Sequence, residues 1–515
     1  MINHQKILSR RFIFFLTTLP ALFFLTYFCH LIWAFTVDDA FIEFRYVENF
    51  VQTGSIAWNI GFLPTEACTS FAHLMLLSLL NFVAISPVVA SKLVGIGSIA
   101  LIYYIILRQI TDDKSTAILW GLLFDFFAMN PATPAHMISG LETTLYLCLI
   151  FMLCMSYTTL SSQRPRFLTF SLLSLLSGLT RPESNAFLLA LLCITPFFLP
   201  SNQKRKFILY EIIFYLLPAI LYFIWRVWYF QLLLPLPFYT KVTGSKLAGA
   251  ATTIDFIKQT YPFFMASFCL LYFSFKKNIL IPIGFLIILV TMFLFAINVK
   301  PIMAFEYRYL YPVTAVLLAF GYCLTQQSTR TKGLLIKIFS ICLMVYCIIQ
   351  LPSTSKRMQF FLDYAASEKN IYGYLGKRLA QLNPTNNFTV ISDAGILPYY
   401  SKLPTLDYWS LTDAHIASEN MNEQQIAHYI FSTITPTIVI VLSQENEKEN
   451  SFVTKKDEAI YIMAKEKDYC VFDILQNMNK EYLWVMVPRK KLTEFEKINP
   501  HKKMLMKHAC FSNGD

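Results

Sequence analysis

The sequence predicts an α-helical polytopic membrane protein that carries an α/β domain at its C-terminal end. Hydrophobic residues make up 56% of the 515 residues and charged residues 15%, whereas soluble domains carry about 25% charged residues. Long apolar runs recur up to residue 351, and the composition then becomes that of a soluble domain. We therefore expect a transmembrane domain over residues 1–351 and a second domain over residues 352–515.

Apolar runs in the first domain are the candidates for membrane spans. They lie near residues 12–35, 70–85, 88–108, 116–130, 142–160, 167–180, 184–200, 207–229, 259–274, 279–297, 310–326 and 334–351. Basic linkers between the runs indicate cytoplasmic loops, by the positive-inside rule. Lys6, Arg10 and Arg11 precede the first run, which is too long for a signal peptide. We therefore expect an uncleaved first span with a cytoplasmic N-terminus.

The two ends of this domain agree only if one run does not cross the membrane. The linkers place the tail after residue 351 outside, and they place residues 38 and 39 outside as well. The run at 70–85 is short and is interrupted by His73, Ser78 and Asn81. We expect it to be an interfacial or re-entrant element of an external loop over residues 36–87. About 11 transmembrane helices then remain.

The second domain has the pattern of a small α/β fold. Buried strands are predicted at residues 388–392, 437–442 and 482–487, separated by helical patterns such as 422–431. No glycine-rich nucleotide loop occurs in this domain. Cys470 and Cys510 either pair or remain two thiols, and their spacing decides neither. We expect this domain on the external, extracytoplasmic side.

The formal net charge of +11 does not indicate a nucleic-acid partner. The positive residues lie in short linkers between apolar runs, not along a stripe of a folded domain. Most of the 11 cysteines lie inside apolar runs and no C-x-x-C pair occurs, so thiol-based metal or redox chemistry is not expected. The composition instead indicates the lipid bilayer as a partner.

Two adjacent carboxylates, Asp38 and Asp39, directly follow the first apolar run. Neighbouring aspartates repel each other, and close to a membrane they also lose hydration. One interpretation is a chemical role, since a carboxylate can accept a proton from a hydroxyl group. The other is capping of the helix that follows, because acids favour a helix N-terminus. The pair alone leaves both interpretations open.

Further ionisable residues gather on the predicted external side: Glu43, Arg45, Glu142, Arg181, Glu183, Lys241, Glu306 and Arg308. Several have structural alternatives. Glu142 suits a first-turn acid, and Lys241 suits an interfacial lysine. Arg181 and Glu183 suit a salt bridge that closes a hairpin. Together these residues favour a phosphate-bearing ligand, because Arg and Lys bind phosphate and nearby aromatic rings can stack on sugars.

Short motifs in a fixed order give the chain a family resemblance. They are Asp-Asp-Ala-Phe-Ile-Glu-Phe-Arg-Tyr (38–46), Trp-Asn-Ile-Gly (58–61), Glu-Ala-Cys-Thr-Ser (66–70), Gly-Leu-Glu-Thr (140–143), Leu-Thr-Arg-Pro-Glu (179–183), Pro-Leu-Pro-Phe-Tyr-Thr-Lys (235–241), Arg-Tyr-Leu-Tyr-Pro (308–312), Asp-Ala-Gly-Ile-Leu-Pro-Tyr-Tyr (393–400) and Asp-Tyr-Trp-Ser-Leu-Thr-Asp (407–413). With them the chain resembles the GT-C superfamily of integral-membrane glycosyltransferases. Within it, the chain resembles the branch that includes the terminal arabinofuranosyltransferase of the mycobacterial cell wall. It departs from that branch at Ala67, Cys68 and Ser410, where the branch has Gly, Tyr and Gly.

The resemblance implies a transferase that moves a sugar from a polyprenyl-phosphate donor to a hydroxyl of a cell-envelope glycan or glycolipid. The reaction would take place on the external face of the bacterial cytoplasmic (inner) membrane. Asp38 and Asp39 would be catalytic, with Asp38 as the base because burial raises its pKa. Donor or acceptor binding would fall to Arg45, Glu142, Arg181, Glu183, Tyr239, Lys241, Arg308 and Asp393. No cofactor is required, and a divalent cation held by the aspartate pair is the alternative.

Two other classes of function compete with a transferase. One is a lipid-linked glycan transporter, whose charges should line a path at mid-membrane depth. In this sequence the charges are predicted at one face instead. The other is an envelope assembly factor without transferase activity, in which the α/β domain would be the working part.

Overall fold

The computed structural model describes residues 2–110, 113–241, 246–275, 279–299, 305–322, 329–419, 421–446 and 451–498. The chain divides into two compact units. The helical unit comprises Met1–Thr36, Thr69–Trp228 and Lys241–Phe361. The sheet unit comprises Val37–Cys68, Tyr229–Thr240 and Leu362–Asp515. Two segments expected as loops between membrane spans, 37–68 and 229–240, therefore belong to the same unit as the C-terminal residues.

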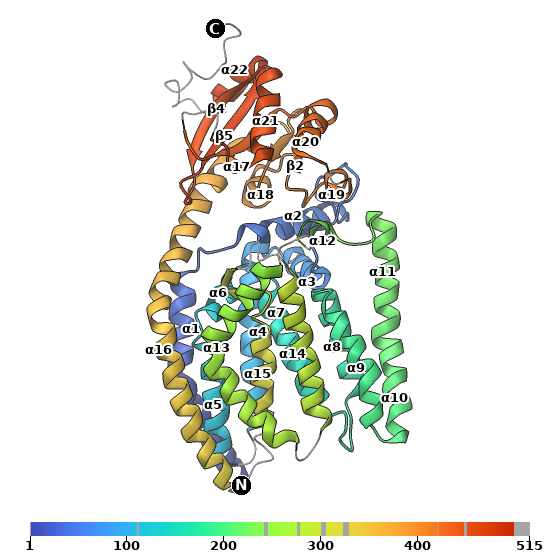
Figure 1. Cartoon of the computed structure of the whole chain (residues 1–515), viewed down its shortest axis with the longest axis vertical. Helices are drawn as coiled ribbons and strands as arrows, with labels where there is room; N and C mark the ends of the chain where they lie inside the picture. Colours follow the sequence, from blue (N-terminus) through green and yellow to red (C-terminus); the bar gives the residue numbers. More distant parts are fainter. Residues whose placement is uncertain are drawn as a thin grey trace. The chain divides into compact units, whose positions relative to one another are not determined.

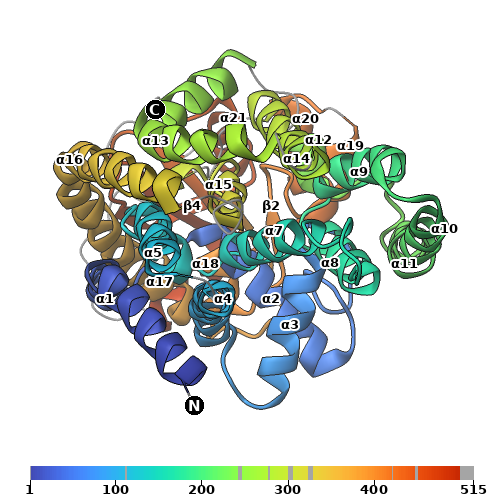
Figure 2. The ribbon, with the colours of Figure 1, turned by 90° about the horizontal axis from the view of Figure 1, so that it is seen from below.

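The apolar runs form the helices of the helical unit (Figure 1). Their bounds are α1 Ile2–Leu31, α3 Phe71–Phe82, α4 Pro87–Gln109, α5 Lys114–Ala128, α6 Ala132–Ile138, α7 Thr143–Tyr157, α8 Phe167–Thr180, α9 Ser184–Phe198, α10 Ser201–Glu211, η1 Ile212–Leu216, α11 Leu217–Phe230, α13 Lys246–Phe275, α14 Leu280–Asn298, η2 Phe305–Tyr307, α15 Val313–Ala319 and α16 Thr329–Ser367. Helix α1 packs along α5, and α7 packs against α4, α8 and α15 (Figure 2). Trp120 and Phe124 of α5 are fully buried. The interior of this unit is therefore formed by helix-on-helix packing of apolar side chains.

Fewer helices can cross a membrane than the sequence predicted. In the described residues, five helices are long and apolar enough, and a sixth is possible if the bent pair α6 and α7 forms one span. The five are Arg10–Leu31, Pro87–Gln109, Ser201–Phe230, Leu280–Asn298 and Thr331–Gln350. The expected count of about 11 is therefore wrong for this part of the chain. The physical reason is length: α8 has 14 residues and α9 has 15, whereas a span needs about 20.

Helix α3 is a related case. It has only 12 residues, which corresponds to roughly 18 Å at the rise of an α-helix. That is shorter than a hydrocarbon core of about 30 Å. The assignment of residues 70–85 as a non-crossing element stays a prediction, and this length agrees with it.

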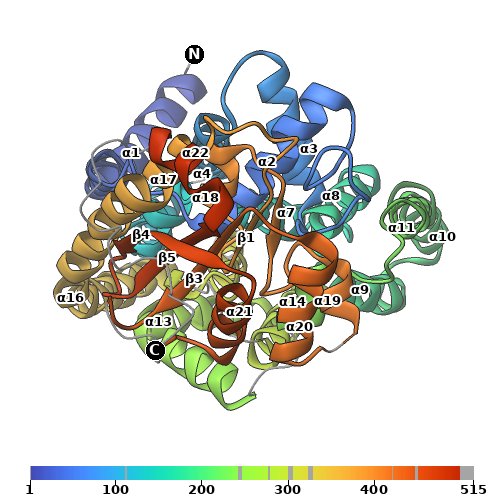
Figure 3. The same ribbon diagram turned by 90° about the horizontal axis from the view of Figure 1, so that it is seen from above.

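The sheet unit combines a five-stranded mixed sheet with short helices (Figure 3). The bounds are α2 Asp38–Thr53, α12 Leu236–Lys241, η4 Glu368–Tyr372, α17 Gly373–Leu379, β1 Thr389–Ile391, α18 Ile396–Ser401, β2 Thr405–Asp407, α19 Ala414–Ser418, α20 Glu423–Tyr429, η5 Ile430–Ile434, β3 Ile438–Ser443, α21 Lys455–Glu466, β4 Tyr469–Gln476, β5 Tyr482–Pro488, η6 Arg489–Lys491 and α22 Leu492–Ile498. The strand order is β2-β1-β3-β5-β4. Strand β1 pairs in parallel with β2 and β3, whereas β5 pairs antiparallel with β3 and β4.

The core of the sheet unit lies between the sheet and helices α20 and α21. Val439 and Val441 of β3 and Trp484 of β5 pack there, together with Ile426 and Ile460 from the two helices. These β-branched and aromatic residues suit a strand that is buried on its faces. The three predicted strands coincide with β1, β3 and β5, while β2 and β4 were not expected.

The structure shows the state of Cys470, one of the two cysteines for which a disulfide was considered. Cys470 in β4 is disulfide-bonded, and Cys510 lies outside the described residues. Thiols inside the helical unit, such as Cys148 and Cys154, are free and buried. They act as small apolar residues there.

Candidate functional site

Asp38 is the first residue of α2, and its carboxylate does not cap that helix. The N-cap position is Val37, which makes no side-chain capping bond. Instead, Asp38 Oδ1 accepts a hydrogen bond from the backbone N–H of Ile396, at 2.7 Å. The backbone N–H of Asp38 donates to the hydroxyl oxygen of Tyr364, at 3.0 Å. The capping interpretation therefore does not describe what this buried side chain does.

Gly395 lies directly against this carboxylate. A Cβ placed on Gly395 would overlap the carboxyl carbon and both oxygens of Asp38. Only glycine leaves enough room, which gives a physical reason for the glycine of the motif at 393–400. The loop between β1 and α18 is thus shaped to receive the Asp38 side chain.

More carboxylates lie near Asp38 in the sheet unit. Asp393 follows β1 and Asp407 ends β2, and these parallel neighbours align Ile391 with Asp407. The carboxyl ends of the two strands therefore bring both acids to one edge of the sheet. Glu368, the first residue of η4, also interacts electrostatically with Asp38.

These acids share an environment that favours their protonated forms. Burial raises the pKa of Asp38 well above its usual range, and repulsion from Asp393 raises it further. Burial also raises the pKa of Asp393 to about 6, of Asp407 to about 8 and of Glu368 to about 9. At neutral pH, Asp407 and Glu368 therefore stay largely protonated, whereas the same side chains would be ionised in water. It can both take up and release a proton.

Glu368 was not singled out from the sequence. Its Oε2 atom is buried and has no hydrogen-bond partner among the described residues. It lies one helical turn after Tyr364, whose hydroxyl contacts Asp38. The spacing of four residues is the only sequence signal, and it becomes informative only once Tyr364 is known to lie near Asp38.

Arg45, predicted to bind donor or acceptor, makes many bonds within the sheet unit. Its Nε donates to the carbonyl oxygen of Trp58 at 2.8 Å, and its guanidinium lies 4.5 Å from the centre of the Trp58 ring. The remaining nitrogens donate to the carbonyl oxygens of Pro398 at 2.7 Å and Leu403 at 2.8 Å, and to Asn59 Oδ1 at 2.9 Å. Arg45 therefore anchors α2 to α18 and to the segment that follows it. A ligand contact for it stays a prediction.

In the helical unit, Glu142 brings two predicted arginines together. Helices α6 and α7 meet at a 113° bend, and Gly140 has φ of 89° there, which favours glycine. Glu142 follows this bend. Arg181 Nε lies 3.0 Å from Glu142 Oε1, and Arg308 lies 3.1 Å from Glu142 Oε2.

Arg181 also contacts Glu183, at 3.5 Å, so the predicted salt bridge between these two residues is present. Burial raises the pKa of the Glu183 carboxyl. The Arg181 guanidinium faces the rings of Tyr146 and Tyr309, at 5.2 Å and 5.8 Å. The cluster of Glu142, Arg181, Glu183 and Arg308, here called the arginine cluster, is thus a buried arrangement with aromatic walls.

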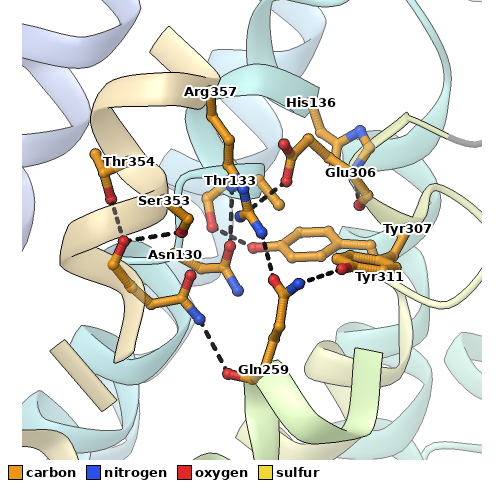
Figure 4. A network of polar contacts seen from close by, with 12 residues as sticks. Asn130, Thr133, His136, Gln259, Glu306, Tyr307, Tyr311, Ser353, Thr354 and Arg357 are labelled. Atoms are coloured by element: carbon orange, nitrogen blue, oxygen red, sulfur yellow. Dashed lines mark hydrogen bonds and ion pairs between the residues drawn. The ribbon is translucent and has the colours of Figure 1, made fainter. Parts of the chain in front are cut away.

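A second polar network surrounds Glu306 (Figure 4). Arg357 of α16 pairs with Glu306 Oε2 at 3.0 Å, and the Glu306 carbonyl oxygen lies 3.0 Å from His136 Nε2. Gln259 of α13 bonds both Arg357 and Tyr307. Glu306 and Tyr307 have φ of 47° and 57°, a left-handed conformation that costs energy in residues other than glycine. The network holds this strained segment, which leads into Arg308.

The other predicted residues are placed as follows. Asp39 is half-buried in the first turn of α2, and Tyr239 is half-buried on α12 in the sheet unit. The side chain of Lys241 lies outside the described residues. In the described part of the chain, no three His, Cys, Asp or Glu side chains are arranged to hold a metal ion. The divalent-cation alternative was made for the Asp38–Asp39 pair alone, and it stays a prediction.

Comparison with known proteins finds likeness mainly at the level of fold. Residues 364–488 match a family described as "Domain of unknown function (DUF8728)". No curated protein matches the chain. The structure of ArnT from Cupriavidus metallidurans in the apo state is 11% identical, with a TM-score of 0.54, over 90% of this chain and 97% of that one.

Two further solved structures give similar values. ArnT bound to undecaprenyl phosphate is 11% identical with a TM-score of 0.52, over 91% of this chain and 97% of that one. The archaeal oligosaccharyltransferase AglB from Archaeoglobus fulgidus, in complex with an inhibitory peptide and a dolichol-phosphate, is 11% identical with a TM-score of 0.51, over 90% and 74%. The chain has the GT-C fold. This confirms the expected fold class in its coarse form, apart from the number of spanning helices.

Proposed function

We propose that this chain is a glycosyltransferase that moves a sugar from a polyprenyl-phosphate donor to a hydroxyl of a cell-envelope glycan or glycolipid. The GT-C fold supports this class of reaction. ArnT was solved with undecaprenyl phosphate and AglB with a dolichol-phosphate, and these lipids support a polyprenyl carrier. The motifs at 38–46 and 393–400 support the arabinofuranosyltransferase branch in particular. We place the reaction on the external face of the bacterial inner membrane, as the positive-inside rule predicts.

The observation that carries this proposal is the buried carboxylate of Asp38 with its raised pKa. In the transfer step, the acceptor hydroxyl oxygen forms a bond to the anomeric carbon of the sugar. The bond from that carbon to the phosphate oxygen breaks, and the polyprenyl phosphate leaves with the electron pair. The carboxylate form of Asp38 accepts the hydroxyl proton, and its raised pKa makes it a stronger proton acceptor than an ordinary aspartate. Asp39 then orients the sugar or the acceptor.

The leaving phosphate develops negative charge, which guanidinium groups can stabilise. We assign this role to Arg181 and Arg308 of the arginine cluster, with Lys241 as a third cation. Glu142 bonds both arginines and so fixes the direction of their donors. Charge-assisted bonds of this kind are stronger than neutral ones. Glu183, Tyr239 and Asp393 remain proposed contacts of the donor or acceptor.

The test is a transfer assay with the purified full-length chain in detergent and radiolabelled undecaprenyl-phosphate sugars, arabinofuranose first. Asp38→Asn should lower the rate by roughly 10²–10⁴-fold, which is typical of a lost general base. Asp468→Asn is the matched control, because Asp468 is exposed on the sheet unit and forms a surface ion pair with Arg489. A transporter or an assembly factor would form no glycosylated product at all. Normal turnover by Asp38→Asn would remove Asp38 from the mechanism.

A further inference from the structure

The sheet unit contains a hollow of about 690 Å³ that none of the acids around Asp38 lines. Residues from α2, from the segment after it, and from the segments that precede β1, β2 and β3 form its walls. We call it the α2 hollow. Its volume lies within the range of roughly 300–1,000 Å³ that is usual for small-ligand sites.

One wall of the α2 hollow is aromatic. The Phe62 ring packs edge-on against Phe388, with centroids 5.8 Å apart. Phe62 is nevertheless 53% exposed. An exposed ring held in place by another ring is a rigid apolar platform that loses little entropy when a ligand covers it.

Other residues that line the α2 hollow carry amides and hydroxyls. Asn49 donates to the carbonyl oxygens of Ala57 and Trp58, at 2.8 Å and 3.1 Å, and these bonds fix the direction of its side-chain oxygen. Gln52 and Asn386 present exposed amide groups to the hollow. An amide both donates and accepts hydrogen bonds, which matches a row of sugar hydroxyls.

Two cations also line the α2 hollow, and both have contacts within the sheet unit. Arg45 donates to four neutral oxygen acceptors, and Lys402 pairs with Glu48. The aromatic ring and the amides are therefore the features of the hollow that match a sugar.

We propose that the α2 hollow binds an oligosaccharide, whose ring stacks on Phe62 while its hydroxyls bond Asn49, Gln52 and Asn386. This deepens the proposed function, on which it rests for the role of the glycan as the bound acceptor. The binding itself requires no transfer chemistry. A glycan held here is recognised by stacking and amide bonds.

The experiment measures binding of fluorescently labelled linear hexasaccharides of arabinose, glucose, mannose and galactose to the purified full-length chain by fluorescence polarisation. Phe62→Ala and Gln52→Ala should each raise the Kd of a binding saccharide about tenfold. Both residues are exposed, so their truncation leaves the core intact. Leu63→Ala is the matched control, because Leu63 is 89% exposed and does not line the hollow.

Two outcomes would overturn the inference. They are binding of none of these saccharides, and an equal loss in Leu63→Ala, which would indicate a general apolar surface. Asp38→Asn separates this inference from the proposed function, since it should abolish transfer and keep saccharide binding. Binding without transfer in the parent chain contradicts the proposed function alone. Transfer without binding contradicts the α2 hollow alone.

Discussion

Position 395 accepts no side chain larger than hydrogen, and the reason is a residue more than 350 positions earlier in the chain. The Asp38 carboxylate fills the space where a Cβ would lie. A methyl group at this position must therefore displace either the loop or the acid. The Ile396 N–H bond to Asp38, the strongest geometric feature of that carboxylate, would be lost with the displacement.

Gly395→Ala should consequently reduce sugar transfer by about the same roughly 10²–10⁴-fold as loss of the base itself. The measurement is the transfer assay, with the thermal midpoint taken in parallel. Gly97→Ala is the control, because a Cβ on Gly97 meets nothing within 4 Å. Full activity of Gly395→Ala would mean that the carboxylate position is not needed for the reaction.

At the scale of elements, the arginine cluster joins the start of α7, the end of α8 and the segment before α15. Arg181 uses Nε and both terminal nitrogens to reach Glu142 and Glu183. A lysine has one charged nitrogen and cannot bridge two carboxylates in this planar way. The orientation of the Arg181 side chain therefore depends on the planar shape of its guanidinium group as well as on its charge.

Arg181→Lys should therefore raise the KM for the polyprenyl-phosphate donor about tenfold, since charge-assisted bonds to the phosphate are lost. Donor saturation curves on the folded variant measure this. Arg489→Lys, in an exposed ion pair of the sheet unit, provides the comparison. An unchanged donor KM in Arg181→Lys would assign the phosphate to other residues.

For the whole molecule, the acids around Asp38 link stability to pH. Their folded-state pKa values are raised, so the folded chain binds protons more tightly than the unfolded chain. The stability that this contributes is complete below the usual carboxyl pKa of about 4 and is lost as the pH rises through the folded-state values. For Asp393, Asp407 and Glu368 those values are about 6, 8 and 9.

The thermal midpoint should accordingly fall between about pH 5 and pH 9. Glu368→Gln, a neutral mimic of the protonated acid, should flatten this fall at its alkaline end. Differential scanning fluorimetry across this range measures both curves. Glu466→Gln, at an exposed position of α21, should follow the parent. Parallel curves for the parent and Glu368→Gln would show that Glu368 is not protonated in the folded chain.

The sequence predicted some of this molecule well, for identifiable physical reasons. Strands β3 and β5 were predictable because their β-branched runs are buried on both faces. Strand β2 was not, since Thr405–Asp407 has three residues and carries no period of its own. Hydropathy overestimated the spans because it does not register where a helix ends, as in α8 and α9, which have 14 and 15 residues.

Some of the candidate site residues could likewise be found from the sequence, and others could be found only from the fold. The Asp38 motif was visible because its acids are adjacent in sequence, and Glu368 was not, because only the fold brings it to Asp38. Ser410 replaces the glycine of the resembling branch and has φ of 69°. A glycine adopts this left-handed backbone conformation without strain, whereas Ser410 adopts it at an energetic cost.

The π-helical turn η4, Glu368–Tyr372, lies between α16 and α17 without a break. A π-turn accommodates one more residue than an α-helical turn, so it has the form that an ancestral α-helix takes after a single-codon insertion. Removing one residue would return the helix to a regular register and rotate everything after it by about 100°. The acid at 368 would then be followed by a helix that points a different face toward α18. A single insertion or deletion in this turn could therefore change whether the acids around Asp38 stay protonated. A comparison of relatives that considers substitutions alone would not detect such a change.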